Sequence, residues 1–414
     1  MTLLAKIGTV AITTAMAGST IAVSDVGFQP KAVLFWWTGR DDAADAAGTA
    51  SHRRGIGWAI STTGRRVCFS QSQDAQASSV ADRAYREDAC IGTLTTAGAV
   101  EGLADLNSMD AGGFTLVIDD AFAAAFRAHY LALGGDDLTH TAVGTFQEPV
   151  GTGTQDVTDV LFEPDLVLFA SIVQTTAPPN ATTHSYLMLG AARSSTQEAV
   201  WTGWARDAQA TMDTFAYCRA GECIAHAGAS TIDSRAEYVG TVANGFRINW
   251  LERDAFQRQV FYLALKGGHY AVGDLLTQTD TVTPIVETGL QIGTPVAVLF
   301  VSATHAQSAT DTADAHDELA IGAATSPSAR VAVAVLDEDA VADSDIGTAV
   351  EYDAVYANLD TASAIEGLMD LQAIDADGFT AIMDDADPAQ AFVWYVAAGH
   401  QGPALHYRRS VGAV

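Results

Sequence analysis

Side chains that could do chemistry are scattered along this chain and do not form a known catalytic motif. The sequence lacks a Gly-x-Ser-x-Gly nucleophile elbow, a phosphate-binding loop, a dinucleotide fingerprint and a His-Glu-x-x-His zinc motif. Carboxylates are abundant, so any pair of them is a weak indication of acid–base catalysis. We therefore predict no enzyme activity, and the sequence assigns no catalytic, cofactor-binding or metal-binding residue and no cofactor.

Three evenly spaced histidines are the sharpest candidates for a shared ligand or ion site. His52, His184 and His316 are 132 residues apart from one to the next, and a neutral imidazole can bind metals. No second histidine or cysteine accompanies all three. The favoured interpretation is a histidine at a strand edge that is hydrogen-bonded to backbone.

Acidic turns suggest Ca²⁺ as an alternative ligand, because this ion prefers several carboxylate oxygens. The acidic residues near two matching turns are Asp375, Asp377, Asp384 and Asp385 in the last third of the chain and Asp110, Asp119 and Asp120 in the first. Their spacing does not fit a twelve-residue EF-hand loop. A tight turn followed by a solvated acidic loop is therefore the favoured interpretation.

The cysteines are too few for a disulfide scaffold in a chain of this length. Cys90 and Cys223 hold matching positions at which the last third has Val355. A residue that exchanges with valine is most simply a small buried apolar group. A disulfide between Cys218 and Cys223 across a hairpin is the alternative.

Two other pairs allow a binding interpretation. Trp36-Trp37 could form a stacking platform for a sugar. Packing in a core or interface is favoured, because the matching positions of the other two thirds hold Ala170-Ser171 and Val301-Ser302. The pairs Arg53-Arg54 and Arg65-Arg66 could meet an acidic partner.

The chain repeats itself with a period of 131 to 134 residues. One pattern occurs as Phe28-Gln-Pro30-Lys-Ala-Val-Leu-Phe35, then around Pro164 and again around Pro295. The other patterns are a Gly-Phe pair at Phe114, Phe246 and Phe379 and a Tyr-x-Ala run at Tyr130, Tyr262 and Tyr395. The sequence therefore predicts three homologous segments, 1–138, 139–270 and 271–414. The apolar N-terminal run, 1–18, has counterparts in the later segments, so we expect it to belong to the fold and not to a secretory signal.

Each segment is typical of an all-β domain. Apolar runs at 32–37 and 166–169 indicate buried strands. Strands that start in tight turns are predicted at 113–118 and 245–250, with returning strands at 126–133 and 259–265. One helix per segment near 99–106 is an open option. We expect three tandem, jelly-roll-like β-sandwiches in a row.

Composition excludes several classes of partner. The 414 residues carry 50 acidic and 21 basic side chains, for a net charge of −29. This charge disfavours nucleic acid and anionic membranes, and no stretch of 18 or more apolar residues suggests membrane insertion. The composition suits a high-salt host. The third segment alone carries 22 acidic and 3 basic residues, so we expect it to be the outermost, with the first segment at an attachment point.

The motif Gly27-Phe28-Gln-Pro30 with its following strand, the later Gly-Phe pair and the closing Tyr130-Leu-Ala-Leu-Gly-Gly resemble β-domains of virion structural proteins of tailed viruses, such as tail fibres, minor tail proteins and surface spikes. Segment three departs from the pattern at Ile292-Gly-Thr-Pro. The resemblance implies a protein on the outside of a virion (a tail fibre, spike, turret or capsid decoration) that is made in the host cytoplasm. It also implies binding to capsid or tail proteins, a homo-oligomer and a host surface glycan or protein as receptor. A secreted lectin-like carbohydrate-binding protein is the alternative.

Overall fold

Every regular element of the described chain is a β-strand. The computed structural model describes residues 2–175, 180–228 and 230–400. Over these residues the chain forms six antiparallel sheets and no helix, which leaves no helical candidate for a membrane span there. The prediction of an all-β protein is confirmed.

Three seven-stranded sheets form the inner part of the molecule. In spatial order, the first contains β1 (Leu4–Ile12), β11 (Phe126–Gly134), β3 (Pro30–Trp37), β5 (His52–Ala59), β6 (Arg65–Ser72), β7 (Ala81–Arg86) and β15 (Asn180–Thr183). The second contains β12 (His140–Gln147), β22 (Gln259–Lys266), β14 (Leu166–Ser171), β16 (Ser185–Ser194), β17 (Gln197–Ala205), β18 (Thr214–Ala220) and β26 (Asp314–Ala315). The third contains β23 (His269–Leu276), β33 (Phe392–Gly399), β25 (Pro295–Ser302), β27 (Asp317–Ser326), β28 (Ala329–Asp337), β29 (Ile346–Glu351) and β4 (Ala46–Thr49).

A four-stranded sheet accompanies each inner sheet. The first contains β2 (Thr20–Val23), β10 (Gly113–Asp120), β9 (Val100–Asp110) and β8 (Ile91–Leu94). The second contains β13 (Gly153–Val157), β21 (Gly245–Glu252), β20 (Ile232–Val242) and β19 (Ile224–Ala227). The third contains β24 (Ile285–Thr288), β32 (Gly378–Asp385), β31 (Ile365–Asp375) and β30 (Tyr356–Leu359). All three segments therefore share one strand order.

Strand β3 shows how the sequence builds two cores at once. Successive side chains of a strand point to opposite faces. Phe35 and Trp37 pack against the four-stranded sheet in the interior of the first sandwich, whereas Leu34 and Trp36 lie in a second core on the other face. A run of apolar residues without alternation is what a strand buried on both faces requires.

The second core is shared by all three segments. It contains Leu34, Leu168 and Leu299 from matching positions of β3, β14 and β25, and the aromatic side chains Trp36, Trp201 and Trp394. Only about 30 Å³ of free space remains among the leucines. The inner faces of the three seven-stranded sheets thus cover one another, and each segment supplies part of the wall of a common interior.

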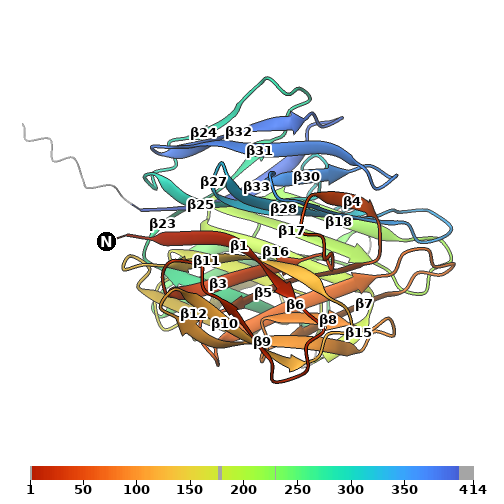
Figure 1. The fold of residues 1–414 in the computed structure, drawn as a ribbon, viewed down its shortest axis with the longest axis horizontal. Helices are drawn as coiled ribbons and strands as arrows, with labels where there is room; N and C mark the ends of the chain where they lie inside the picture. Colours follow the sequence, from red (N-terminus) through yellow and green to blue (C-terminus); the bar gives the residue numbers. More distant parts are fainter. Residues whose placement is uncertain (1, 176–179, 229, 401–414) are drawn as a thin grey trace, which may run out of the picture.

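Strand exchange closes the three segments into a ring. Strand β15 of the second segment pairs with β7 of the first, and β26 of the third pairs with β18 of the second. Strand β4 of the first segment completes the cycle by pairing with β29 of the third. In Figure 1, β4 is the red strand that lies beside the blue strands of the third segment.

Backbone hydrogen bonds repeat this cycle at the loops. In each case an amide donates to a carbonyl of the preceding segment, and the three bonds are Ala208 to Ser79 at 2.8 Å, Ala340 to Met212 at 3.0 Å and Ala75 to Ser344 at 2.8 Å. The donors Ala75, Ala208 and Ala340 all have positive φ. The same local backbone conformation therefore makes the same joint three times.

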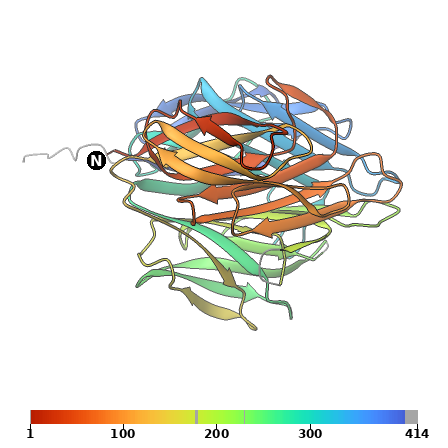
Figure 2. The same ribbon diagram turned by 60° about the horizontal axis from the view of Figure 1, so that its bottom comes forward.

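The arrangement of the segments differs from the expected row. Figure 2 shows the strands of the first (red to orange), second (yellow to green) and third (blue) segments packed side by side around one interior. A ring has no inner and outer end, so the charge of the third segment does not make it the outermost part of a linear protein. The expectation failed because the second apolar face of strands such as β3 needs cover from the other segments.

The predicted strands at 32–37, 166–169, 113–118, 245–250, 126–133 and 259–265 are confirmed as parts of β3, β14, β10, β21, β11 and β22. Phe114, Phe246 and Phe379 are fully buried at matching positions of the four-stranded sheets. The glycine before each phenylalanine is required by close packing. A Cβ at Gly113, for example, would lie 1.9 Å from the carbonyl oxygen of Val23.

The helix option near 99–106 is wrong, because residues 100–106 form part of strand β9. Strand β9 pairs with β8 on one side and with β10 on the other. The backbone also passes close to an aromatic ring, since a Cβ at Gly102 would lie 2.2 Å from Phe122. Hydrogen bonding to strands on both sides therefore outweighs the local helical preference of these residues.

Candidate functional site

A cavity of about 620 Å³ opens where the first and second segments meet. It is bounded by strand β7 of the first segment and by strands and loops of the second. The residues that line it are Arg83, Val173, Thr175, His184, Trp204, Arg206, Ala227, Gly228, Asp233, Phe256 and Arg258. Three arginines in the lining are unusual for a chain with a net charge of −29.

Arg83 is the most informative of these arginines. It lies on β7 and is only 9% exposed. Its guanidinium donates to the carbonyl oxygens of Thr183, His184 and Val173. No carboxylate among the described residues forms an ion pair with it, and burial lowers the pKa of Arg83 to about 10. The group still carries its positive charge at neutral pH, so the cavity holds a cation that no carboxylate of the described chain neutralises by direct contact.

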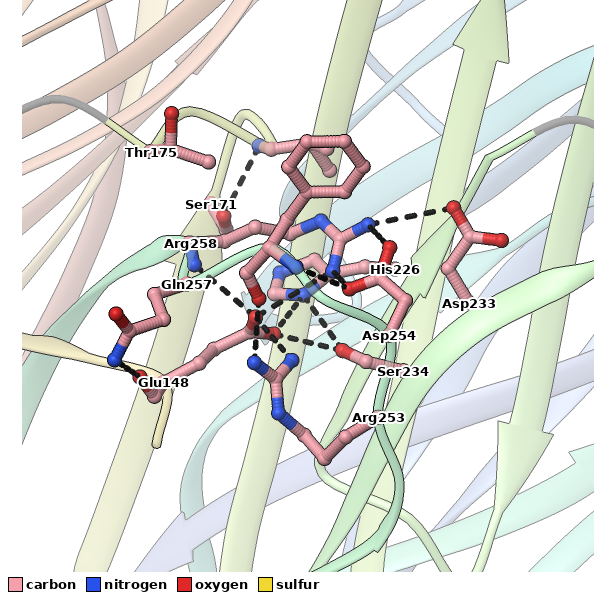
Figure 3. Close-up of polar contacts among 12 residues, drawn as sticks. Glu148, Ser171, Thr175, His226, Asp233, Ser234, Arg253, Asp254, Gln257 and Arg258 are labelled. Atoms are coloured by element: carbon pink, nitrogen blue, oxygen red, sulfur yellow. Dashed lines mark hydrogen bonds and ion pairs between the residues drawn. The ribbon is translucent and has the colours of Figure 1, made fainter. Parts of the chain in front are cut away.

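Arg258, on the loop before β22, is fully neutralised by comparison. Its guanidinium binds both carboxylate oxygens of Asp254, at 2.7 and 2.6 Å, and lies 3.3 Å from Asp233. Figure 3 shows this guanidinium between the two aspartates. A fork-to-fork pair of this kind fixes the arginine in one orientation, so Arg258 forms a rigid side of the cavity.

Buried Glu148 anchors the same loop from below (Figure 3). Its carboxylate accepts hydrogen bonds from the Arg258 backbone amide at 3.1 Å and from Ser234 at 2.7 Å, and it pairs with Arg253. Burial opposes its ionisation, but His226 and the arginine and serine partners outweigh burial and lower the pKa of Glu148 to about 2. Glu148 is therefore a buried anion that holds the cavity loop in place.

His226 completes this network as a neutral ring. Its Nδ1 lies 2.6 Å from Glu148, and burial lowers its pKa, so Nδ1–H donates to the carboxylate. Nε2 has no hydrogen-bond partner among the described residues, and the ring is fully buried. Ser234 donates to Glu148 and not to Nε2. The three side chains therefore brace the loop and do not form a nucleophile with its base.

An aromatic wall faces the arginines. Trp204 on β17 stacks on Phe215 with ring centroids 5.9 Å apart, while Phe256 is 60% exposed. The guanidinium of Arg258 lies over the Phe256 ring at 5.6 Å. A cavity that is lined by an exposed aromatic ring and by Arg83, which has no ion-pair partner among the described residues, suits a ligand with an apolar face and an anionic group.

The equal spacing of the three histidines proves misleading. His184 and His316 occupy matching positions with φ of 69°, and each Nδ1 accepts a backbone amide, from Asp207 at 2.8 Å and from Asp339 at 2.9 Å. This confirms backbone hydrogen bonding for these two. His52 is not their counterpart, because it lies inside β5, fully buried and 3.3 Å from Asp337. Ser51 takes the corresponding place and accepts the Asp74 amide at 3.1 Å.

The acidic turns stabilise the chain locally. Asp110 accepts hydrogen bonds from Ser108 and Thr115, and Asp375 accepts one from Thr380. Asp377 accepts the Ile292 amide, while Asp384, Asp385, Asp119 and Asp120 are exposed at the ends of β32 and β10. Within the described residues, three potential metal ligands converge at another place, formed by Asp45, Glu351 and Asp353.

The remaining candidates lie inside the molecule. Cys90, Cys223 and Val355 are fully buried at matching positions, as predicted, and Cys218 and Cys223 are both free thiols. Trp36 and Trp37 are buried in the two cores, so they present no stacking platform on the surface.

The arginine pairs are engaged within the chain. Arg54 binds Asp317, Arg65 binds Asp105, Arg66 lies 3.4 Å from Glu87 and Arg53 lies 3.8 Å from Glu101. The hypothesis that these arginines meet an acidic partner does not hold for Arg54, which is fully buried and pairs with Asp317 of the same chain.

Sequence reasoning missed Arg83, although a signal was present. The strand pairing places Ala216 and Thr348 at the positions that match Arg83. A charged residue that occurs in only one of three matching strands has a local role. The sequence does not show this role, because it depends on the exchanged strand β15, which places the second segment beside Arg83.

No family model matches this sequence, and a search of curated proteins finds no significant relative.

Proposed function

We propose that this chain is a structural protein on the outside of a tailed-virus particle, as part of a tail fibre, spike, turret or capsid decoration. The three segments are proposed to be homologous, jelly-roll-like copies of one sandwich. The observation that carries the proposal is the strand exchange that joins them into one ring. A body with three matching sides fits the symmetric attachment points of a virion, and the resemblance of the segment motifs to virion β-domains supports it.

The proposed partners are capsid or tail proteins. The inner sheets already cover one another within one chain, so the proposed homo-oligomer forms through the outer surfaces. The acidic exterior keeps such a body apart from nucleic acid. The proposed role is mechanical and adhesive and requires no catalysis.

The test is localisation on intact particles. An antibody raised against the folded protein should label the outside of purified virus in electron micrographs, and mass spectrometry should find the chain in those particles. Genes for portal, capsid or tail-tube proteins should lie beside its gene. Detection only in a secreted fraction without particles would contradict the proposal.

A second candidate is carbohydrate binding, either in a secreted lectin or as the receptor contact of the virion. The specific observation is the cavity with Arg83, Trp204 and Phe256. Arginine recognises carboxylates in a planar, two-point geometry, and aromatic rings stack on sugar faces. The chemistry favours an acidic glycan such as one that contains uronic or sialic acid.

We expect Arg83→Met to weaken binding of acidic oligosaccharides by at least about tenfold, since one charge-assisted hydrogen bond contributes about 1.5–3 kcal/mol. Saturation-transfer NMR against matched acidic and neutral oligosaccharides would measure this. Arg247→Met is the control, because Arg247 is exposed and binds only Asp156. Equal affinity for acidic and neutral glycans, or unchanged binding by the Arg83 variant, would remove the second candidate.

A further inference from the structure

The joint between the third and first segments contains three carboxylates. Asp45 directly precedes the exchanged strand β4, while Glu351 ends β29 and Asp353 follows it. One oxygen from each of the three side chains lies within 4.8 Å of the other two. Two of these residues are separated from the third by about three hundred positions, so the group exists only because the ring closes.

The same position at the other two joints holds a cation. The strand register matches Glu351 with Arg86 at the end of β7 and with Arg219 on β18. Arg86 binds Asp88 through two hydrogen bonds of 2.8 and 2.7 Å, and Asp88 is the counterpart of Asp353. In the third segment the aspartate is kept, but its arginine is replaced by a glutamate. The joint between the third and first segments therefore keeps the carboxylate, Asp353, but has no arginine to pair with it.

Glu351 itself has no protein partner among the described residues. It is 6% exposed, and no residue of the described chain forms a hydrogen bond or ion pair with its carboxylate. Arg40 is the basic residue whose charge acts on Glu351, and it is engaged by Asp42 and Thr348. Burial, together with Asp45 and Asp353, raises the pKa of Glu351 to about 7. A buried carboxylate beside two others is costly unless a cation neutralises it.

We propose that a Ca²⁺ ion binds between Asp45, Glu351 and Asp353 and ties the first segment to the third. Ca²⁺ accepts six to eight oxygen ligands in flexible geometry, so three carboxylates and water can satisfy it. Asp45 and Asp353 are exposed, which leaves room for that water. The ion takes the place of the arginines at the other two joints. This inference is independent of the proposed virion role.

Calorimetric titration of the chelator-treated full chain with CaCl₂ tests the site. One calcium ion should bind per chain, and calcium should raise the unfolding temperature at pH 7.5. Mg²⁺ should bind more weakly, because it loses its water reluctantly.

Two variants separate the calcium site from general effects of acidic residues. Glu351→Gln should lose the calcium heat and the thermal shift. Asp120→Asn removes an exposed carboxylate at the end of β10 that is not part of the group, and it should keep both. Glu351→Arg restores the arrangement of the other joints and should raise the unfolding temperature in EDTA while abolishing the calcium response. No calcium binding at millimolar concentration, or calcium binding that survives Glu351→Gln, would overturn the proposal.

Discussion

A chain shortened after Gly268 is expected to lose its folded structure. Removing the third segment deletes strand β29, with which β4 pairs, and strand β26, which pairs with β18. It also uncovers the large apolar faces around Leu34, Trp36 and Leu168 in the shared core. A folded monomer that exposes these apolar faces to water is unstable, so aggregates or unfolded chains are favoured.

Circular dichroism, binding of a hydrophobic dye and size-exclusion chromatography would measure the result. We expect aggregation or strong dye binding for residues 1–268 and for each single segment. The full chain prepared in the same way is the control. A monomeric single segment with a cooperative unfolding transition would show that the segments are independent domains, as the expected row of sandwiches implied.

The second large effect is expected from a single charge in the interior. Arg54 and Asp317 are both fully buried, and they form two hydrogen bonds of 2.8 and 2.5 Å. Asp317→Ala leaves the guanidinium without its anion, which costs about 3–5 kcal/mol of unfolding free energy. Urea unfolding followed by tryptophan fluorescence would measure the loss.

A double variant distinguishes the charge from the packing. Arg54→Leu combined with Asp317→Leu removes both charges and should recover most of the lost stability, because apolar pairs often replace buried ion pairs at no cost. Asp156→Ala breaks the exposed pair with Arg247 and should leave the unfolding free energy almost unchanged, because solvent screens exposed ion pairs. If Asp317→Ala is as mild as Asp156→Ala, the buried pair does not hold the segments together.

Local pattern carried the prediction of most strands. The apolar run that became β3 and the Gly-Phe turns before β10 and β21 signal their structure within a few residues. The exchanged strands carry no such signal, because β4 reads Ala-Ala-Gly-Thr and is defined by pairing with a strand about three hundred positions away. The cavity and the carboxylate group were missed for the same reason, since both lie at joints that these strands create.

Equivalent positions around the shared interior carry different charges. His52, Ser185 and Asp317 begin the matching strands β5, β16 and β27, and Arg54 of the first segment reaches both Ser185 and Asp317. Three identical chains assembled in this way would place three copies of the same residue here, so that an acid would meet two other acids. Because the three segments belong to one polypeptide, each of these positions can mutate alone. An imidazole, a hydroxyl and a carboxylate can therefore occupy matching positions that would all carry the same residue in a symmetric trimer of identical chains.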